Sequence, residues 1–416
     1  MKSSIADSAP SQANQTRRID GIARRLLHKQ LAQLNCGELL LVDGETHRFG
    51  SVTSDFPLSV TIQVCDQGFY SDVVFGGSVG AGEAYMAGLW TCSDLTALVR
   101  ILLRNRHVLD GMDSGYSWIA TPLRNLIHAL NRNTKTGSRR NIAAHYDLGN
   151  EFFRLFLDET MMYSAAIFET PETSLKDASI AKLDLICRKL KLQAHDHVIE
   201  IGTGWGGFAI HAATHYGCKI TTTTISQNQF DLAQERIRQA GLEDQIILLL
   251  EDYRELKGQY DKLVSIEMIE AVGHHYYKQF FKQCASLLKP NGLMLLQAIT
   301  IADQQFASAR DEVDFIKRYI FPGSCIPAIT PLLQAATRSS DLKLVHLEDI
   351  GPHYATTLNR WRNNFFNHID EVRKLGYPDS FIRMWEFYLT YCEGGFIERV
   401  LGDVHMLLMK PLNRSV

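Results

Sequence analysis

Three spaced glycines follow a short β-branched run in the stretch Val198-Ile-Glu-Ile-Gly-Thr-Gly-Trp-Gly-Gly207, and a helix-like segment, FAIHAATHYG, comes next. Glycines in such a strand–turn–helix unit let the backbone turn tightly and approach a ligand with no side chains in the way. The same pattern also occurs in ordinary β–α connections. The turn therefore indicates a nucleotide-type cofactor site, but it needs support from the residues around it.

Spacing in and after this turn separates the cofactor classes. A dinucleotide site requires G-x-G-x-x-G and an acidic residue about 20 positions later. This chain has G-x-G-x-G-G, and the next strand segment, Cys218 to Ser226, ends in hydroxyl residues followed by Gln229, with no acid. NAD and FAD are therefore disfavoured, and the lack of G-x-x-x-x-G-K-[ST] excludes a P-loop. A compact E-x-G-x-G-x-G turn suits S-adenosylmethionine, which has no pyrophosphate.

Composition narrows the class of protein. The chain has 416 residues, is 45% hydrophobic and 21% charged, and carries a net charge of −3, which gives no reason to expect a nucleic-acid partner. Its eight cysteines occur singly without a C-x-x-C pair, a pattern that argues against metal ribbons and disulfide frameworks and fits a reducing cytosol. We expect no metal site. No apolar run approaches a membrane span, and the polar N-terminus lacks a signal-peptide pattern.

Changes in the pattern along the chain predict four segments. We expect a disordered tail at 1–16, a smaller α+β domain at 17–128, a polar basic linker at 129–141 and a catalytic domain at 142–416. The α+β domain is predicted from the basic helix RRIDGIARRLLHKQLAQL, the strands SVTIQV and FYSDVVFGG, and the helix DLTALVRILLRN. The basic helix can lie on an anionic membrane or pack on its own domain, and its length favours packing.

Strands and helices alternate beyond the linker. The strand candidates are VIEIG (198–202), KITTTTI (219–225), IILLLED (246–252), KLVSIEMI (262–269), LMLLQAITI (293–301), LKLVHLEDI (342–350) and HMLLMKP (405–411). Near-continuous apolar strands separated by helices predict a doubly wound parallel sheet of the α/β class. Cofactors in such sheets bind outside the carboxyl ends of the strands, so the loops there are the candidate site.

Four segments around those loops resemble the cyclopropane fatty acid synthase family, which includes the mycolic acid cyclopropane synthases. They are HYDLGNEFFRLFLDETMMYSAAIF (145–168), VIEIGTGWGG with TTTTISQNQ, SIEMIEAVGHHYY (265–277), and DFIKRYIFPGSCIP followed by GPHYATTLNRW. The resemblance covers roughly residues 140–416. The N-terminal stretch GEAYMAGLWTCSDL also resembles bacterial and plant members.

The resemblance implies a Rossmann-like class I methyltransferase domain and a reaction. In that reaction, S-adenosylmethionine delivers its methyl group to a cis double bond of an acyl chain in a membrane phospholipid, and a bound bicarbonate removes a proton so that a cyclopropane ring closes. It also implies a cytoplasmic protein at the inner face of the membrane and a possible homodimer. Aromatic faces would stabilise the carbocation, which must be kept from water.

The resemblance also implies the residues of two sites. The cofactor positions are Tyr163, Ser164, Gly202, Gly204, Thr224, Ile225, Gln229, Asp252 and Tyr253. The bicarbonate positions are Glu270, the backbone N–H of Ile299, and Tyr354. Cys392, in YLTYCEGGF, matches a cysteine proposed as an active-site residue of the family, although direct methyl transfer needs no nucleophile and a core role is favoured.

Two positions depart from the bacterial pattern. Ala165 stands in Y-S-A-A where the family often has Y-S-C-A, and Gln297 stands where it often has histidine. Glutamine can donate to an anion but cannot titrate, and plant members also have it. These departures motivate one alternative, a methylated or methylene chain without a ring. Two further alternatives are a non-catalytic lipid-binding homologue and a small-molecule N- or O-methyltransferase.

Overall fold

The computed structural model describes residues 9–108 and 148–415, so the linker expected at 129–141 lies outside the described residues. The chain divides into two compact units. Unit 1 comprises Met1–Asn125 and Tyr377–Glu398, and unit 2 comprises Leu126–Gly376 and Arg399–Val416.

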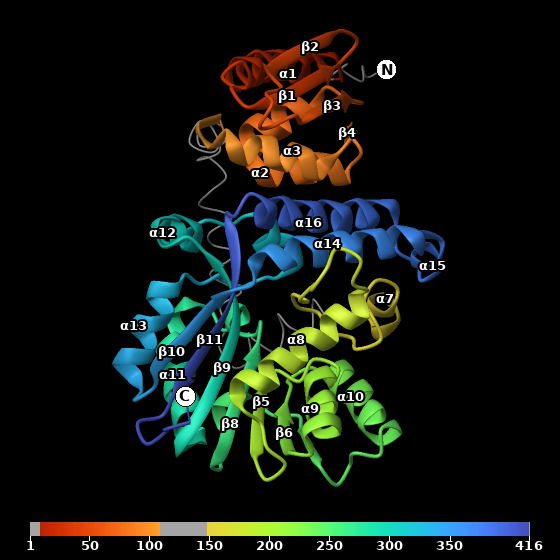
Figure 1. Ribbon diagram of the computed structural model, residues 1–416. Coiled ribbons are helices and arrows are strands. Elements are labelled where there is room, and N and C mark those ends of the chain that lie inside the picture. The colour runs from red at the N-terminus through yellow and green to blue at the C-terminus, as the bar shows by residue number, and fades with distance from the viewer. Residues whose placement is uncertain (1–8, 109–147, 416) are drawn as a thin grey trace, which may run out of the picture. The chain divides into compact units, whose positions relative to one another are not determined.

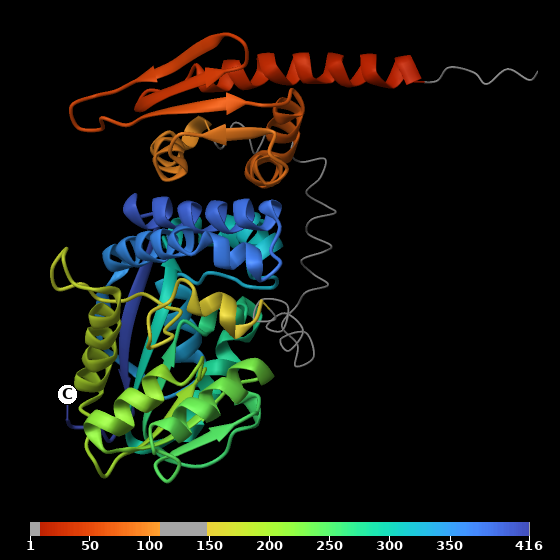
Figure 2. The ribbon, with the colours of Figure 1, turned by 90° about the vertical axis from the view of Figure 1, so that its right-hand side faces the viewer.

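Unit 1 is built on a four-stranded sheet in the order β2-β1-β3-β4, in which β1 runs parallel to β3 and the two outer pairings are antiparallel. The strands are β1 (Gly37–Val42), β2 (Thr46–Ser51), β3 (Ser59–Val64) and β4 (Trp90–Cys92). The helices are α1 (Ala9–Leu31), α2 (Gly68–Met86), α3 (Leu95–Arg104) and α16 (Asp379–Ile397). Figure 2 shows α1 as one continuous helix beside the strands.

Helix α1 begins at Ala9, inside the segment that we expected to be a disordered tail. Its Ala23, Leu27 and Leu31 are buried, whereas Ile19 and Ile22 are exposed. The helix thus packs on its own unit through one face, as its length favoured, and contact with a membrane remains a prediction. Among the described residues, no helix is both long and apolar enough to cross a bilayer.

The strand predicted over FYSDVVFGG is wrong, because these residues form the first half of α2. Phe69, Tyr70, Val73 and Val74 are all buried, and their spacing places them on one face of a helix. A helix kink at Gly77 (φ 58°, ψ −145°) follows, a conformation that glycine adopts at little cost.

The expected catalytic domain is also not continuous, because Tyr377–Glu398 belongs to unit 1. Helix α16 is fixed there by polar contacts that span about 300 positions of sequence. Tyr85 donates to Glu386 (2.7 Å), Thr96 donates to Glu393 (3.1 Å), and Arg100 pairs with Glu398 (2.7 Å). Such long-range pairing leaves no local signal in the sequence.

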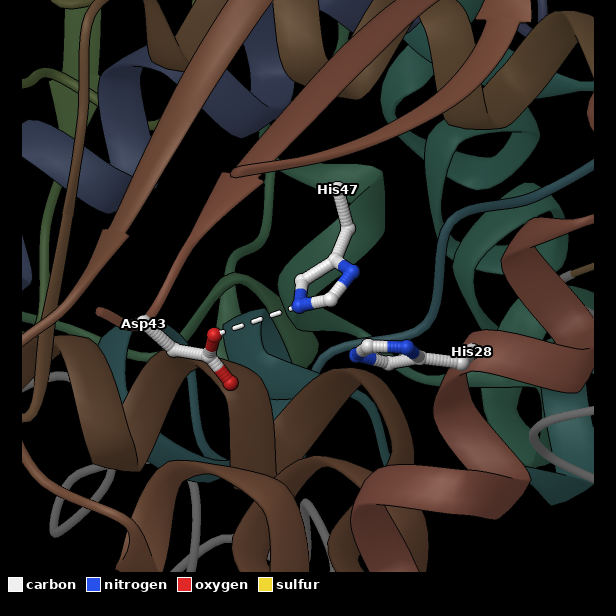
Figure 3. A group of neighbouring side chains, drawn as sticks. All are labelled: His28, Asp43 and His47. Atoms are coloured by element: carbon white, nitrogen blue, oxygen red, sulfur yellow. Dashed lines mark ion pairs between the residues drawn. The ribbon is translucent and has the colours of Figure 1, made fainter. Parts of the chain in front are cut away.

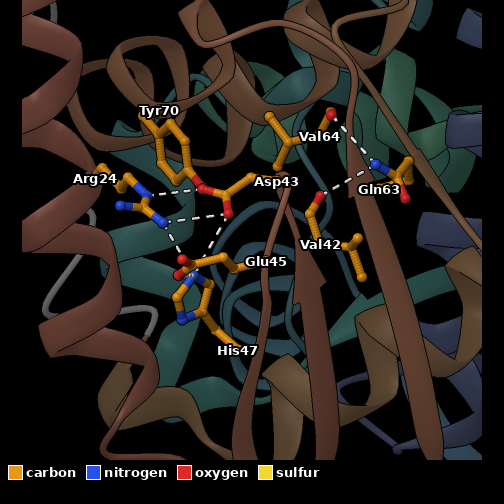
Figure 4. Close-up of polar contacts among 8 residues, drawn as sticks. All are labelled: Arg24, Val42, Asp43, Glu45, His47, Gln63, Val64 and Tyr70. Atoms are coloured by element: carbon orange, nitrogen blue, oxygen red, sulfur yellow. Dashed lines mark hydrogen bonds and ion pairs between the residues drawn. The ribbon is translucent and has the colours of Figure 1, made fainter.

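A polar cluster in unit 1 holds His28, Asp43 and His47 close together (Figure 3). Asp43 already accepts hydrogen bonds from Arg24 Nε (2.7 Å) and from the Tyr70 hydroxyl, and Arg24 also contacts His47 (2.9 Å) (Figure 4). A divalent cation there would lie beside the Arg24 guanidinium and compete with it for the carboxylate. We therefore interpret the cluster as a tie between α1, the β1–β2 turn and α2.

Unit 2 contains a seven-stranded sheet in the order β10-β11-β9-β8-β5-β6-β7 (Figure 1). Its strands are β5 (His197–Ile201), β6 (Lys219–Thr223), β7 (Ile246–Leu249), β8 (Tyr260–Ile266), β9 (Leu288–Ile301), β10 (Lys343–Asp349) and β11 (Leu401–Met409). The strands from β5 to β9 pair in parallel, and β11 lies antiparallel between β9 and β10. Every strand predicted in this region is confirmed, with shifted ends.

Helices cover both faces of this sheet, which confirms the doubly wound α/β class. One face packs against α11 (Tyr277–Leu287) and α13 (Ile329–Ser339), and the other packs against α8 (Leu175–Leu190), α9 (Gly207–Tyr216) and α10 (Gln227–Gln239). The remaining elements of unit 2 are α7 (Asn150–Arg154), η2 (Tyr253–Glu255), η3 (Ile269–Ala271), η4 (His274–Tyr276), α12 (Asp303–Asp311), η5 (Ile316–Ile320), α14 (Gly351–Asn367) and α15 (Ile369–Lys374).

Gly394 provides a test of how α16 packs within unit 1. A Cβ at this position would lie 2.6 Å from Val99 Cγ1 and 2.9 Å from Val99 Cβ on α3. Because β-branched valine cannot move aside easily, we expect Gly394→Ala to lower the free energy of unfolding by about 1–3 kcal/mol. Gly21→Ala on α1 meets nothing within 4 Å and should instead raise it by up to about 1 kcal/mol. Urea denaturation of both variants measures their free energies of unfolding. Equal changes in the two variants would contradict the close packing of Gly394 on Val99.

Candidate active site

The glycine turn adopts the conformation that its sequence predicted. Gly202, Gly204 and Gly206 all have positive φ (101°, 53° and 86°), and α9 starts directly after them. L-amino acids with side chains rarely adopt these angles. The turn thus carries the chain from the carboxyl end of β5 into a helix N-terminus, where backbone N–H groups are available to a ligand.

The residues predicted after the second strand also lie at its carboxyl end. Thr224 and Ile225 follow β6, and the Thr224 hydroxyl donates to the side-chain oxygen of Gln229 (2.8 Å). Gln229 is buried, and Ser226 caps its helix. The bond fixes the orientation of the Gln229 amide, so that its NH₂ group can donate to an uncharged oxygen such as a ribose hydroxyl.

Asp252 and Tyr253 follow β7, as predicted, but the Asp252 carboxylate is not open. It accepts hydrogen bonds from the backbone N–H (3.0 Å) and the Nε (2.8 Å) of Arg254. The Tyr253 ring packs edge-on against Phe280 at 5.6 Å between centroids. The structure therefore places both residues at the third strand and fixes them there, while their contact with adenine remains a prediction.

Tyr163 and Ser164 belong to a segment, residues 160–166, that lies against the glycine turn. A Cβ on Gly207 would fall 2.8 Å from the carbonyl oxygen of Thr160 and 2.6 Å from Met162 Sδ, so only glycine permits this approach. Arg236 on α10 joins the two parts. It donates to the carbonyl oxygens of Trp205 (2.5 Å), Glu159 (3.0 Å) and Thr160 (3.1 Å).

Aromatic rings surround the Tyr163 side of this segment. The Tyr163 ring lies 5.4 Å from Phe153 and 5.1 Å from Trp361, measured between centroids, and Trp361 lies 6.0 Å from Tyr354. The rings thus form a continuous path from the cofactor side of the segment to the predicted anion site. Aromatic faces of this kind can stabilise a positive charge.

The residues predicted to bind bicarbonate make different contacts in the structure. The Ile299 N–H donates to Glu270 Oε1 (2.6 Å), and the Tyr354 hydroxyl donates to Glu267 Oε2 (2.7 Å). Gln297 Nε2 donates to Glu267 Oε1 (2.7 Å) and to Asp403 (2.9 Å). The structure therefore brings the predicted residues together, but carboxylates of the chain itself occupy the donors that we assigned to bicarbonate.

Three charged residues at this site are not among those predicted from the sequence. Glu267 follows β8 in I-E-M-I-E, where only the second acid was considered, and its backbone has a positive φ of 46°. Lys182 lies on the apolar face of α8, and its ammonium donates to Ser164 (2.7 Å). Asp403 lies on β11. The sequence signal for Lys182 is its spacing of four residues from Ala178 and Ile186, which places a lysine on the apolar face of the helix.

Burial dominates the electrostatics of the cluster. Burial, and then Glu267, raise the pKa of Glu270 to about 8, so this residue is mostly protonated at pH 7. Burial also raises the pKa of Glu267, and burial together with Glu267 raises the pKa of Asp403 well above its usual range. Burial lowers the pKa of Lys182 to about 8, against the opposing attraction of the acids. The charge on Glu267 thus affects the pKa of the other three groups.

Cys392 lies on α16, which belongs to unit 1, whereas the other predicted site residues belong to unit 2. Its role at the site therefore remains a prediction. The eight cysteines are all free thiols, as their spacing predicted.

Arg236 allows the link between the 160–166 segment and the glycine turn to be tested. Arg236→Ala removes three hydrogen bonds from a charged donor, so we expect S-adenosylhomocysteine to bind at least about tenfold more weakly while the fold persists. Arg238→Ala, on the same helix, removes an exposed side chain that pairs with Glu235 and should leave binding unchanged. Calorimetric titration measures both, and equal affinities for the two variants would show that the link does not support cofactor binding.

Comparisons with known proteins place this site in a family. The sequence model described as "Mycolic acid cyclopropane synthetase" matches residues 133–406. The tuberculostearic acid methyltransferase UfaA1 of Mycobacterium tuberculosis is 38% identical over 77% of this chain and 76% of its own length. The cyclopropane-fatty-acyl-phospholipid synthase of Escherichia coli K12 is 34% identical over 81% of this chain and 85% of its own.

A solved structure gives the same result. Mycolic acid cyclopropane synthase CmaA1, complexed with SAH and CTAB, superposes with a TM-score of 0.61 at 30% identity, covering 65% of this chain and 98% of that one. The matched segments contain the glycine turn, the 160–166 segment and the carboxylate cluster. The chain therefore belongs to the mycolic acid cyclopropane synthetase family, a family of S-adenosylmethionine-dependent lipid methyltransferases.

Proposed function

We propose that this enzyme transfers the methyl group of S-adenosylmethionine to a cis double bond of an unsaturated acyl chain in a membrane phospholipid. The observation that carries the proposal is the position of the 160–166 segment. Its Thr160 and Met162 lie against Gly207 of the glycine turn, and its Ala165 N–H donates to Glu267 in the carboxylate cluster (2.8 Å). A methyl donor bound at the glycine turn would thus lie beside the aromatic path and the buried acids.

The side chains on this path have defined tasks in such a reaction. Attack of the double bond on the methyl group leaves a positive charge on the acyl chain, which the faces of Tyr163 and Trp361 can stabilise. Buried rings also exclude the water that would trap this charge. A base must then take a proton from the methylated chain, because without this step the cation has no stable product.

A cyclopropane ring is the first product that we propose. Glu270, Gln297 and Tyr354 still cluster at the carboxyl ends of β8 and β9 and at α14. The E. coli relative, which is named a cyclopropane-fatty-acyl-phospholipid synthase, matches more than four fifths of this chain. The enzyme would work from the cytoplasmic side of the membrane, on lipid that it contacts peripherally, and a homodimer is part of the same expectation.

A methylated or methylene chain without a ring is the second candidate product. Ala165 provides no thiol beside the cluster, and Gln297 cannot titrate. The name of UfaA1 describes a methyltransferase, not a ring-forming enzyme. Both products arise from the same methyl transfer, but the methylene chain also requires a hydride shift to the cationic carbon before the proton leaves.

The product distinguishes these candidates directly. The full chain is incubated with S-adenosylmethionine carrying a ¹³C-labelled methyl group and with vesicles of dioleoyl phosphatidylglycerol and phosphatidylethanolamine. We expect the label to enter the acyl chains and, in proton NMR, to give the upfield ring-methylene signals of a cyclopropane. Vinylic or branched-methyl signals would establish the second candidate. Label-free lipid, despite measurable S-adenosylhomocysteine affinity, would refute methyl transfer to phospholipid and favour a lipid-binding protein or a small-molecule methyltransferase.

A further inference from the structure

Three hydrogen-bond donors from three separate segments meet at the carboxylate of Glu267. The backbone N–H of Ala165 (2.8 Å) and Gln297 Nε2 (2.7 Å) donate to Oε1, and the Tyr354 hydroxyl (2.7 Å) donates to Oε2. Gln297 also accepts the backbone N–H of Glu267 through its carbonyl oxygen (2.9 Å). A carboxylate with this set of partners is bound as an external anion would be.

These contacts test whether bicarbonate fits the site. Tyr354 and Ile299 were expected to bind it, but the first donates to Glu267 and the second to Glu270. Bicarbonate would have to displace a carboxylate from each donor. It would also add a negative charge beside Glu267, Glu270 and Asp403, in surroundings where burial makes like charges repel strongly. The residues present therefore do not fit bicarbonate.

We propose that the carboxylate of Glu267 is the general base of this enzyme and takes the place of a bound anion. This proposal rests on the proposed methyl transfer to an acyl double bond. The base is then part of the chain, and turnover requires no bicarbonate.

The proton transfer balances without any other reactant. After methyl transfer, the acyl chain carries a positive charge on the carbon next to the methylated one. Glu267 takes a proton from the new methyl group. The electron pair of the broken methyl C–H bond then forms a C–C bond to the cationic carbon, which closes a cyclopropane ring. If a hydride first shifts from the methylated carbon to the cationic carbon, the same proton removal yields a methylene (C=CH2) branch on the chain instead. In both cases the proton ends on Glu267 and passes to solvent.

Glu267 suits this role better than the other acids of the cluster. Glu267 is intermediate in exposure, whereas Asp403 is fully buried. Three donors stabilise its ionised form, whereas Asp403 Oδ1 and Glu270 Oε2 have no hydrogen-bond partner among the described residues. The positive φ of Glu267 (46°) costs conformational energy, and such strain in a non-glycine residue is typical of functional sites.

The groups around Glu267 set its proton affinity. Lys182 from α8 favours the ionised form, and Tyr354 from α14 stabilises it by donation. Burial and Glu267 raise the pKa of Asp403 from β11 well above its usual range, and burial raises the pKa of Glu270 from η3 to about 8. Of the three acids, Glu267 therefore has the most partners that favour its ionised form, the Lys182 ammonium among them.

The first experiment compares two isosteric changes. We expect Glu267→Gln to reduce the turnover of labelled methyl groups into dioleoyl phospholipid by about 100-fold or more, with S-adenosylhomocysteine affinity kept within about twofold. Glu270→Gln should retain at least about tenfold more turnover than Glu267→Gln, because the amide resembles the protonated acid. If bicarbonate is the base, the order reverses, since Glu270 would then be its principal ligand.

A second experiment replaces the side chain by an added anion. Glu267→Gly frees the donors of Ala165, Gln297 and Tyr354 and relieves the positive φ. Millimolar bicarbonate or formate should therefore restore turnover by about tenfold or more over the unsupplemented variant. The unaltered enzyme should turn over equally in bicarbonate-free buffer. Loss of its activity on removing bicarbonate, or full activity of Glu267→Gln, would overturn the proposal. No methyl transfer by the unaltered enzyme in any buffer would instead refute the proposed function.

Substitution of Lys182 tests the role of Glu267 through the pH dependence of turnover, which would not change if Glu267 were only structural. Lys182→Met removes the cation that lowers the pKa of Glu267, so the acidic limb of the turnover–pH profile should move to higher pH. Lys176→Met, on the same helix, removes an exposed lysine that pairs with Glu159 and should leave the profile in place. A profile unmoved in both variants would show that no carboxylate beside Lys182 acts as the base.

Discussion

The hydrogen bonds to Glu267 join three parts of the fold. Ala165 comes from the segment against the glycine turn, Gln297 from β9, and Tyr354 from α14. Two of the donors are themselves held: Gln297 by the sheet and by His405 (3.2 Å), and Tyr354 by the ring of Trp361. Removing the carboxylate would take a buried acceptor from all three, and leaving a buried donor unsatisfied is more costly than losing the bond itself. One side chain therefore fixes how the 160–166 segment and α14 meet β9.

The missing thiol at Ala165 has a different meaning in this setting. A cysteine side chain at this position would contribute a weak donor, but the backbone N–H of the residue donates whatever its side chain is. That N–H binds Glu267 in this protein. Gln297 likewise acts through its amide hydrogens, so the absence of a titratable histidine leaves the contact intact. Both departures from the family pattern are consistent with a site that binds a carboxylate of the chain.

The sequence predicted the sheet of unit 2 well because burial on both faces turns each parallel strand into an apolar run that is visible locally. FYSDVVFGG failed because a short apolar run bounded by glycines fits a strand and a buried helix equally well. The placement of α16 failed for another reason: its partners lie about 300 positions away. The predicted cofactor positions at the glycine turn and after β6 and β7 lie in loops that follow strands, whereas Tyr163 and Ser164 could be assigned only through the family resemblance. Glu267 was not predictable, since the pattern I-E-M-I-E does not tell which acid meets the donors. A left-handed backbone at one residue decides that.

Cofactor binding and base positioning are coupled through the 160–166 segment. Arg236 and the close approach at Gly207 hold its first half on the glycine turn, and the N–H of Ala165 holds its second half on Glu267. Between them, Ser164 accepts a hydrogen bond from the buried Lys182 ammonium, which favours the ionised form of Glu267. Displacement of the segment from the turn would withdraw a donor from Glu267 and loosen the contact with Lys182. Both changes raise the proton affinity of the carboxylate and favour its protonated, inactive form. The Ala165 N–H and the Lys182 ammonium both lower the pKa of Glu267 while the segment lies on the turn, so the position of the segment affects the proton affinity of the proposed base.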